Sequence, residues 1–191
     1  MPSDPPILAF DTSAAHCAAA LLCGDAVIES RAETLAKGQA ERLLPFLQEI
    51  LNETGHDWRD LARIGVGIGP GNFTGIRISV AAARGLALGL GIPAIGVSTL
   101  DAIAYLHFGA MAAVTAPRDM LYAQPPGGTA TLRTAADVAN PVFAPEAAAL
   151  AEAIASCAAS ADAAAAGRPK PLYIKPADAA PSRIEAPVIL P

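Results

Sequence analysis

Two short segments carry the residue types that could bind a ligand. Asp11-Thr12-Ser13 follows the apolar run Ile7 to Phe10, which predicts a central strand. The glycine-rich segment Gly69 to Gly75 lies between a predicted strand and a predicted helix. A carboxylate and hydroxyls at the end of such a strand lie where α/β sheets bind ligands, and a glycine loop before a helix can offer N–H groups to an anion. The candidate phosphate or ligand residues are Asp11, Thr12, Ser13, Gly69, Gly71, Asn72, Thr74 and Gly75.

Both segments also have an explanation that needs no ligand. Asp11 can accept hydrogen bonds from the turn that follows it, and the glycines can allow a tight turn that packs a strand against a helix. The loop lacks the lysine of a Walker A motif. Gly67, Gly69 and Gly71 are spaced as GxGxG, whereas a dinucleotide loop needs GxGxxG. From the residues alone, both interpretations stay open.

Metal and nucleophile chemistry have little support in the sequence. His16, His56 and His107 lie far apart, and no pair has the helical spacing that places two imidazoles on one ion. There is no GxSxG motif, and Ser13 and His16 are too close in one segment to form a convincing triad. We therefore predict no catalytic residue and no metal site on this chain.

Composition narrows the class of protein. The chain has 191 residues, of which 53% are hydrophobic and 16% charged, so it can bury a core. Its formal charge of −5 argues against binding nucleic acid alone, because phosphate recognition normally needs a basic face. The most apolar stretch, Ile78 to Val97, is interrupted by Arg84 and Pro93, so we expect no membrane span. Three cysteines without a CxxC pair and a start without basic residues predict a cytoplasmic protein with reduced thiols.

The apolar patterns predict a mixed α/β architecture. Three strand signals come first, and helices then alternate with strands up to about Phe108. The order β-β-β-α-β-α-β-α predicts a mixed sheet with helices on its faces. After Ala110 the signals weaken to two short strands, an Ala-rich helix over 145–166 and a proline-rich, extended tail from Pro169. We expect one domain over residues 1–110 and a shortened second domain over residues 111–191.

Two of the predicted helices are apolar enough to bind a partner. The first ends near Gly55 and carries an apolar stripe, and the second, from Ile76 to Leu90, is apolar nearly all round. Together they could exceed what the core of so small a chain covers, which predicts an interaction surface. The candidate interface residues are Leu43, Leu47, Ile50, Arg77, Val80, Ala81 and Arg84.

These segments resemble the TsaB (YeaZ) family. Ile7 to Ser13 (ILAFDTS) resembles the start of that family, and Gly67 to Arg77 (GIGPGNFTGIR) resembles its most distinctive segment. Glu41 to Pro45 is similar to the family's first helix, and Pro171 to Ile174 is similar to a short tail motif. The resemblance covers residues 7–105. It implies an actin-like ATPase fold built of two ribonuclease-H-like halves, of which the second is reduced here.

The resemblance also implies a function. It implies a non-catalytic partner subunit in the transfer of a threonylcarbamoyl group to adenosine beside the anticodon of tRNA. TsaD and TsaE would be partners, with ATP and metal on the partner subunits, no cofactor on this chain, and tRNA bound only through the complex. The TsaD contact would use helices over about 39–52 and 76–90. The same helices could form a homodimer when TsaD is absent.

The sequence departs from the family pattern at one pair of residues, and one alternative function stays open. Gln39-Ala40 stands where family members often have His-Ser, so one potential ligand is missing, which favours the non-catalytic role. The alternative is an ATP-binding ATPase or kinase of the actin-like superfamily that uses Asp11 and the glycine loop.

Overall fold

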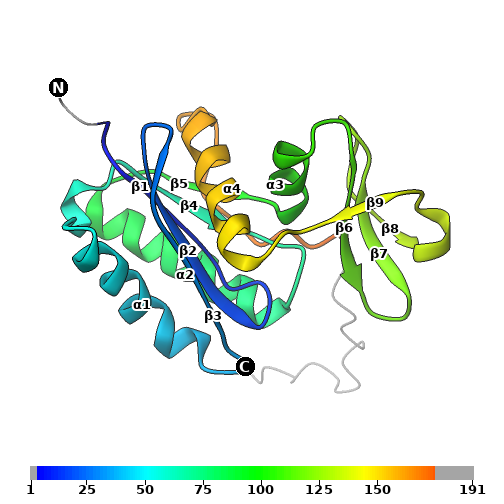
Figure 1. Ribbon diagram of the computed structural model, residues 1–191, viewed down its shortest axis with the longest axis horizontal. Helices are drawn as coiled ribbons and strands as arrows, with labels where there is room; N and C mark the ends of the chain where they lie inside the picture. Colours follow the sequence, from blue (N-terminus) through cyan, green and yellow to red (C-terminus); the bar gives the residue numbers. More distant parts are fainter. Residues whose placement is uncertain (1–3, 175–191) are drawn as a thin grey trace, which may run out of the picture.

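The structure is a computed structural model, and it describes residues 4–174. The first part of the chain forms the predicted order of three strands followed by alternating helices and strands (Figure 1). The elements are β1 (Ile7–Asp11), β2 (His16–Cys23), β3 (Ala26–Thr34), α1 (Gln39–Glu53), η1 (Trp58–Asp60), β4 (Arg63–Gly67), α2 (Phe73–Leu90), β5 (Ala94–Val97) and α3 (Thr99–Leu106).

The first sheet has the strand order β3-β2-β1-β4-β5. β1, β2 and β3 form an antiparallel meander, whereas β4 and β5 run parallel to β1. The predicted mixed sheet is therefore confirmed. Parallel pairing brings the C-terminal ends of β1 and β4 to one edge, and the segments that follow these two strands are the predicted ligand segments.

Alternation along β1 decides how the two faces of this sheet are covered. Leu8 and Phe10 point toward α1 and α2, while Ala9 points to the opposite face. That opposite face is covered by α4 (Ala147–Ser160), as Figure 1 shows. Small side chains let α4 lie close to the sheet, since a Cβ added at Gly65 would be 3.0 Å from Ala158 Cβ. The large side chains of the core therefore lie on the α1–α2 side.

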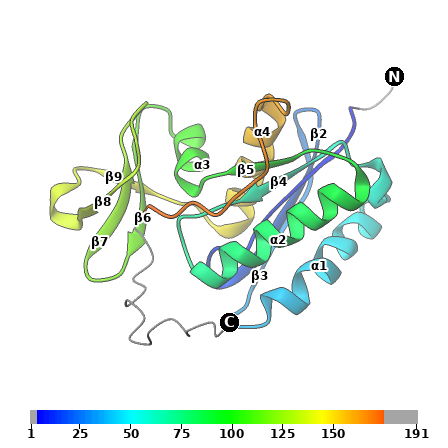
Figure 2. The same cartoon turned by 180° about the vertical axis from the view of Figure 1, so that it is seen from behind.

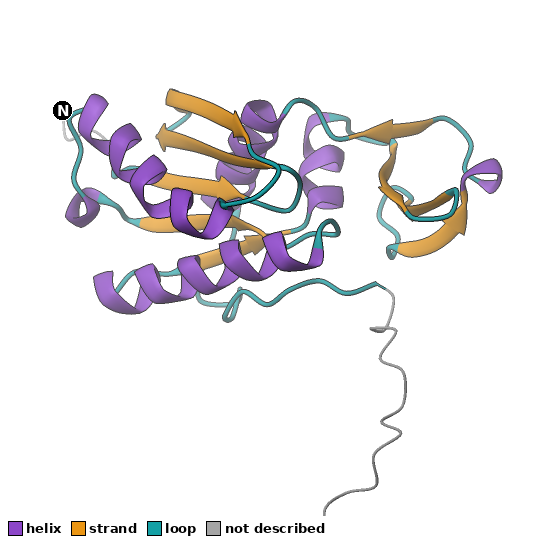
Figure 3. Cartoon of the chain, turned by 90° about the horizontal axis from the view of Figure 1, so that it is seen from below, coloured by secondary structure: helices purple, strands orange, loops and turns teal. Residues whose placement is uncertain are grey.

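The second part of the chain forms a smaller sheet with the order β8-β7-β6-β9. Its strands are β6 (Met111–Ala116), β7 (Met120–Gln124), β8 (Thr131–Thr134) and β9 (Pro141–Phe143), with the short helix η2 (Ala135–Asp137) before β9. Arg118 and Asp119 have positive φ in the predicted turn between β6 and β7. Figure 3 shows this sheet beside the larger unit. β8 and β9 were not predicted, because both are very short and β8 has no buried residue.

The Ala-rich helix packs on a different sheet from the one its position in the sequence suggests. α4 follows β9 in the chain but packs against β1, β2 and β4 of the first sheet. It also ends at Ser160, earlier than predicted. The division of the chain at residue 110 stays a prediction. α4 lies after that residue in the sequence, yet it packs on the sheet formed before it.

After α4, residues 168–174 form what we call the C-terminal strap. Figure 2 shows it running from the first unit toward the second sheet. The Leu172 N–H donates to Ile68 O at 2.9 Å, and Ile174 packs against the cluster formed by Leu100 and Ile103 of α3 and Ala112 of β6. The rest of the predicted tail, residues 175–191, lies outside the described residues.

Candidate functional site

Asp11 is the centre of the turn between β1 and β2. It is fully buried, and its Oδ2 accepts hydrogen bonds from Ser13 N at 2.9 Å and Ser13 Oγ at 2.8 Å. His16 Nε2 lies 2.9 Å from the same oxygen. Oδ1 lies against Gly67, where an added Cβ would be 1.9 Å away, and has no hydrogen-bond partner in residues 4–174. Both carboxylate oxygens are therefore enclosed by the protein itself.

The two predicted ligand segments meet, and they bond to each other. Asn72 N donates to Ser13 O at 2.6 Å, and Thr12 Oγ1 donates to Gly75 O at 2.7 Å. A Cβ added at Gly75 would lie 1.8 Å from Thr12 O, and one at Gly71 would lie 2.4 Å from Ser13 O. Glycine is required at both positions because another backbone segment occupies the space of a side chain. This contact by itself explains the glycines at these two positions.

The remaining loop residues also have structural partners. Gly69 adopts φ 89°, and its carbonyl accepts a hydrogen bond from Thr99 N at 2.9 Å. Asn72 caps α2, since its side chain accepts from Gly75 N at 3.0 Å. α2 consequently begins at Phe73, three residues before the predicted start, and Thr74 is exposed in its first turn. The spacing Asn-x-x-Gly before an apolar helix is the signal that indicates this cap.

A cavity of about 470 Å³ opens beside this turn, between the two sheets. Ser13, His16, Gly71 and Thr99 line it from the first part of the chain, and Phe143 lines it from the second sheet. Within residues 4–174 there is no cluster of three or more His, Cys, Asp or Glu side chains that could hold a metal ion.

The structure corrects four of the predicted interface residues. Leu43, Leu47, Ile50 and Val80 are 0–3% exposed, because they pack into the chain's own core. In this conformation Leu47, Ile50 and Val80 offer almost no surface to a partner, whereas Leu43 also lines a groove between α1 and α2. Arg77, Ala81 and Arg84, the other predicted residues, are exposed on α2. The error arose because an apolar stripe on a helix first covers its own sheet.

The exposed surface between α1 and α2 is formed by other side chains. A groove of about 500 Å³ runs between the two helices, and Leu44 and Phe73 on its walls are 47% and 46% exposed. Its lining residues are Ala40, Leu43, Leu44, Phe73, Thr74, Arg77, Ile78, Ala81 and Ala82. Helical spacing does not single out Leu44, since Leu51, seven residues later on nearly the same face, is fully buried.

α2 is an apolar helix that the rest of the chain covers only in part. It is long and apolar enough to span a membrane by length and composition, yet only 28% of its residues are buried. Here one face packs on β4, and the other carries Arg77, Ala81, Arg84 and Leu88 into solvent. An apolar helix that keeps much of its surface exposed to solvent is typical of a protein interface.

The outer edge of α1 is charged. Arg42 donates to Glu33 Oε2 at 2.8 Å and to Glu49 Oε1 at 2.7 Å. These hydrogen bonds lower the pKa of both Glu33 and Glu49. These two carboxylates are thus paired with Arg42, and among residues 4–174 no carboxylate lines the groove.

Comparison with known proteins agrees with this geometry. A family model described as "TsaD: tRNA N6-adenosine threonylcarbamoyltransferase" matches residues 27–124, which is half of the chain. The Escherichia coli protein named "tRNA threonylcarbamoyladenosine biosynthesis protein TsaB" is 42% identical over 98 residues. The Bacillus subtilis protein of the same name is 41% identical over 98 residues. The chain belongs to this family, within its TsaB (YeaZ) branch.

The TsaB match covers about half of this chain and less than half of the relatives. It spans 51% of this chain, 42% of the E. coli protein and 43% of the B. subtilis protein.

Structural similarity extends over more of the chain than sequence similarity does. A Pseudomonas aeruginosa crystal structure described as similar to peptidase YEAZ has a TM-score of 0.73 at 27% identity, covering 89% of this chain and 99% of that one. A second structure, YeaZ from the same organism, has a TM-score of 0.67 at 27% identity, covering 88% and 99%. The fold is therefore that of the YeaZ structures, within the actin-like superfamily.

Proposed function

We propose that this chain is a non-catalytic partner subunit of the complex that transfers a threonylcarbamoyl group to adenosine next to the anticodon of tRNA. In this role it binds TsaD and supports it. The printed names of the TsaB relatives supply the pathway. The observation that carries the subunit role is the exposed apolar groove between α1 and α2.

The groove supports a protein partner for two reasons. It exposes a leucine and a phenylalanine side chain side by side in one apolar groove, and such patches mark interaction sites. It also lies along two helices of 15 and 18 residues, which can present a rigid surface without reordering.

The Asp11 turn supports the absence of a cofactor on this chain. Ser13 and His16 engage one oxygen of Asp11, and the other is buried against Gly67 without a hydrogen-bond partner in residues 4–174, so Asp11 exposes no surface to a cofactor in this conformation. In this proposal ATP and metal bind to the partner subunits, TsaE joins the assembly, and tRNA reaches this chain only through the complex, in the cytoplasm.

The test is co-purification with TsaD from the same organism. Ala81 is exposed in the groove, so Ala81→Asp should fold normally and lose binding, because an unpaired charge in an apolar contact costs on the order of 3 kcal/mol. Ala136→Asp, at an exposed site in η2, is the matched control and should bind as the wild type does. Normal binding by a folded Ala81→Asp variant would place the TsaD contact elsewhere.

The alternative function, ATP binding, has one observation in its favour, the cavity beside Ser13 and Gly71. Isothermal titration of the isolated chain with ATP and Mg²⁺ separates the two functions. We expect no heat of binding. Micromolar binding that is lost in Ser13→Ala, a variant that leaves the Asp11 side chain in place, would favour the enzyme.

A further inference from the structure

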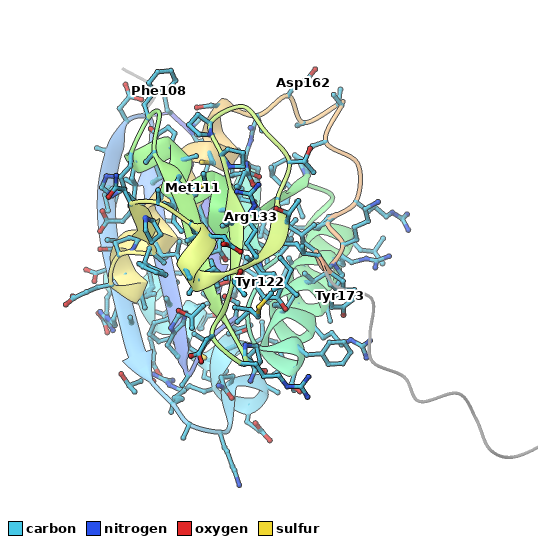
Figure 4. The ribbon with its side chains drawn as sticks, turned by 90° about the vertical axis from the view of Figure 1, so that its right-hand side faces the viewer. Phe108, Met111, Tyr122, Arg133, Asp162 and Tyr173 are labelled. Carbon is cyan, nitrogen blue, oxygen red and sulfur yellow. The ribbon has the colours of Figure 1, made fainter. Side chains whose placement is uncertain are left out.

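The C-terminal strap brings a residue distant in sequence to the end of the α1–α2 groove. Leu172 is held by its hydrogen bond to Ile68 O. Pro169 packs closely against Gly96, since a Cβ added at Gly96 would lie 3.2 Å from Pro169 Cβ. These two anchors fix the backbone on both sides of Lys170 and Pro171 and direct Tyr173 toward α2. Figure 4 labels Tyr173 near the end of the described chain, on the side of the green helix α2.

Tyr173 forms a compact cluster with two residues of α2. Its ring is stacked on Phe73, with centroids 5.4 Å apart and an interplanar angle of 27°. The guanidinium carbon of Arg77 lies 3.9 Å from the Phe73 centroid, and Arg77 Nε donates to Tyr173 Oη at 3.0 Å. Each of the three side chains therefore holds the other two in place before any partner arrives.

This cluster contributes little to the chain's own core. Phe73 is 46% exposed and Tyr173 is 45% exposed, so both rings keep a large area in contact with water. Phe73 and Arg77 also line the groove. No carboxylate lines the groove, and Arg77 forms no ion pair with any residue in the range 4–174. The cluster thus offers exposed aromatic area and a cation that has no counter-charge among residues 4–174.

We propose that Phe73, Arg77 and Tyr173 are the energetic centre of the partner surface. The partner inserts an aliphatic side chain against the two rings and places a carboxylate beside Arg77. Aromatic residues and arginine supply most of the binding energy in protein interfaces, and groups already held in position lose little entropy on binding. A cation covered by a partner needs an anion in return, which is why the partner carries a carboxylate.

This inference rests on the proposed function, and it makes the strap part of the binding surface. The helices alone would present Phe73 and Arg77 without the hydroxyl that holds the guanidinium. Residues about 100 positions apart in the sequence therefore build one contact.

The test is the dissociation constant of the full chain with purified TsaD, measured by isothermal titration. Tyr173→Ala and Arg77→Gln should each weaken binding by tenfold or more. Tyr173→Phe keeps the stacked ring and loses only the hydroxyl, so its effect should be several-fold smaller than that of Tyr173→Ala. Tyr105→Ala is the matched control, because Tyr105 is 54% exposed on α3 and does not line the groove, and it should leave binding unchanged.

Amide hydrogen exchange at Leu172 shows whether each variant keeps the strap in place. If Tyr173→Ala releases the strap, Arg77→Gln decides, since Arg77 is held by α2. Wild-type affinity in both variants, together with lost binding in Ala81→Asp, would overturn this inference and leave the proposed function intact. Absence of binding between the wild-type chain and TsaD would overturn both.

Discussion

His16 Nε2 lies 2.9 Å from Asp11 Oδ2, inside the turn that joins the first two strands. The same oxygen accepts from the backbone and the hydroxyl of Ser13. A carboxylate at the end of a central strand is typical of a ligand site, but here the turn itself bonds to Oδ2, and Oδ1 is buried against Gly67. We therefore expect Asp11 to stabilise the fold of this turn, whether or not a ligand binds nearby.

The first prediction concerns this carboxylate. Asp11→Ala should lower the free energy of unfolding by about 2 kcal/mol, because Ser13 N, Ser13 Oγ and His16 lose a charged partner in a buried turn. Urea denaturation measures the change. Asp25→Ala, in the exposed turn between β2 and β3, should stay within about 0.5 kcal/mol of wild type. Equal stability of the two variants would show that the turn does not depend on Asp11.

The second prediction compares three glycines of the same helix. Gly75→Ala should destabilise the protein by about 1–3 kcal/mol or more, since the new methyl would meet Thr12 O. Gly85→Ala and Gly89→Ala have open space around the new methyl and should each stabilise the helix by about 0.5–1 kcal/mol. Thermal unfolding of the three variants gives the sign directly. A neutral Gly75→Ala would mean that the two loops separate easily.

The third prediction distinguishes core from surface on α1. Leu47→Ala should cost about 2–5 kcal/mol of unfolding free energy, because Leu47 is fully buried. Leu44→Ala, three residues earlier on the same helix, should stay within about 0.5 kcal/mol, since Leu44 is half exposed. Urea titration of both variants is sufficient. A large loss in Leu44→Ala would contradict the assignment of Leu44 to the groove.

The fourth prediction concerns thiol reactivity and pH. Burial, with Asp101 adding to it, raises the pKa of Cys157 from 9.0 to about 11. At pH 8 its thiolate fraction is then roughly a hundredfold lower than that of an ordinary thiol, and only the thiolate is alkylated. The iodoacetamide rate, followed by mass spectrometry, should rise up to about pH 11. In denaturant the rise should level off near pH 9.

The same shift has a consequence for stability. A thiol whose pKa is raised in the folded state stabilises the fold below the unfolded pKa, and this contribution is lost as the pH rises from about 9 to about 11. The pKa of Cys17 is also raised to about 11, first by burial and then by the nearby Glu33 carboxylate. Cys17 is fully buried and should react only after unfolding. Rapid alkylation of native Cys157 at pH 8 would contradict the burial of this thiol.

Local sequence pattern was sufficient wherever the signal lies within one element. The meander of β1 to β3, the helix that ends at Gly91 and the strand Ala94–Val97 each carry their own period and end signals. The joining of Asp11-Thr12-Ser13 with the glycine loop was not predicted, because it depends on the parallel pairing of β1 with β4, which brings the ends of both strands to one edge.

The role of Asp11-Thr12-Ser13 and the glycine loop, in ligand binding or in packing, could not be predicted from local pattern. Whether the two loops hold a ligand or each other depends on how closely their backbones approach at Gly71 and Gly75, where an added Cβ would lie 2.4 Å and 1.8 Å from a backbone oxygen of the other loop. β8 and β9 gave no usable signal, since strands of four and three residues are too short to show a period.

By itself, the sequence determined the family, the order of elements up to α3 and the excess of apolar side chains on two helices, because period, end signals and motif are properties of neighbouring residues. Only the tertiary structure decided that Leu43 is buried while Leu44 is exposed, that α4 packs on the first sheet, and that Tyr173 lies on Phe73. Burial and contact depend on residues that are distant along the chain and meet only when the chain folds, so no local pattern records them.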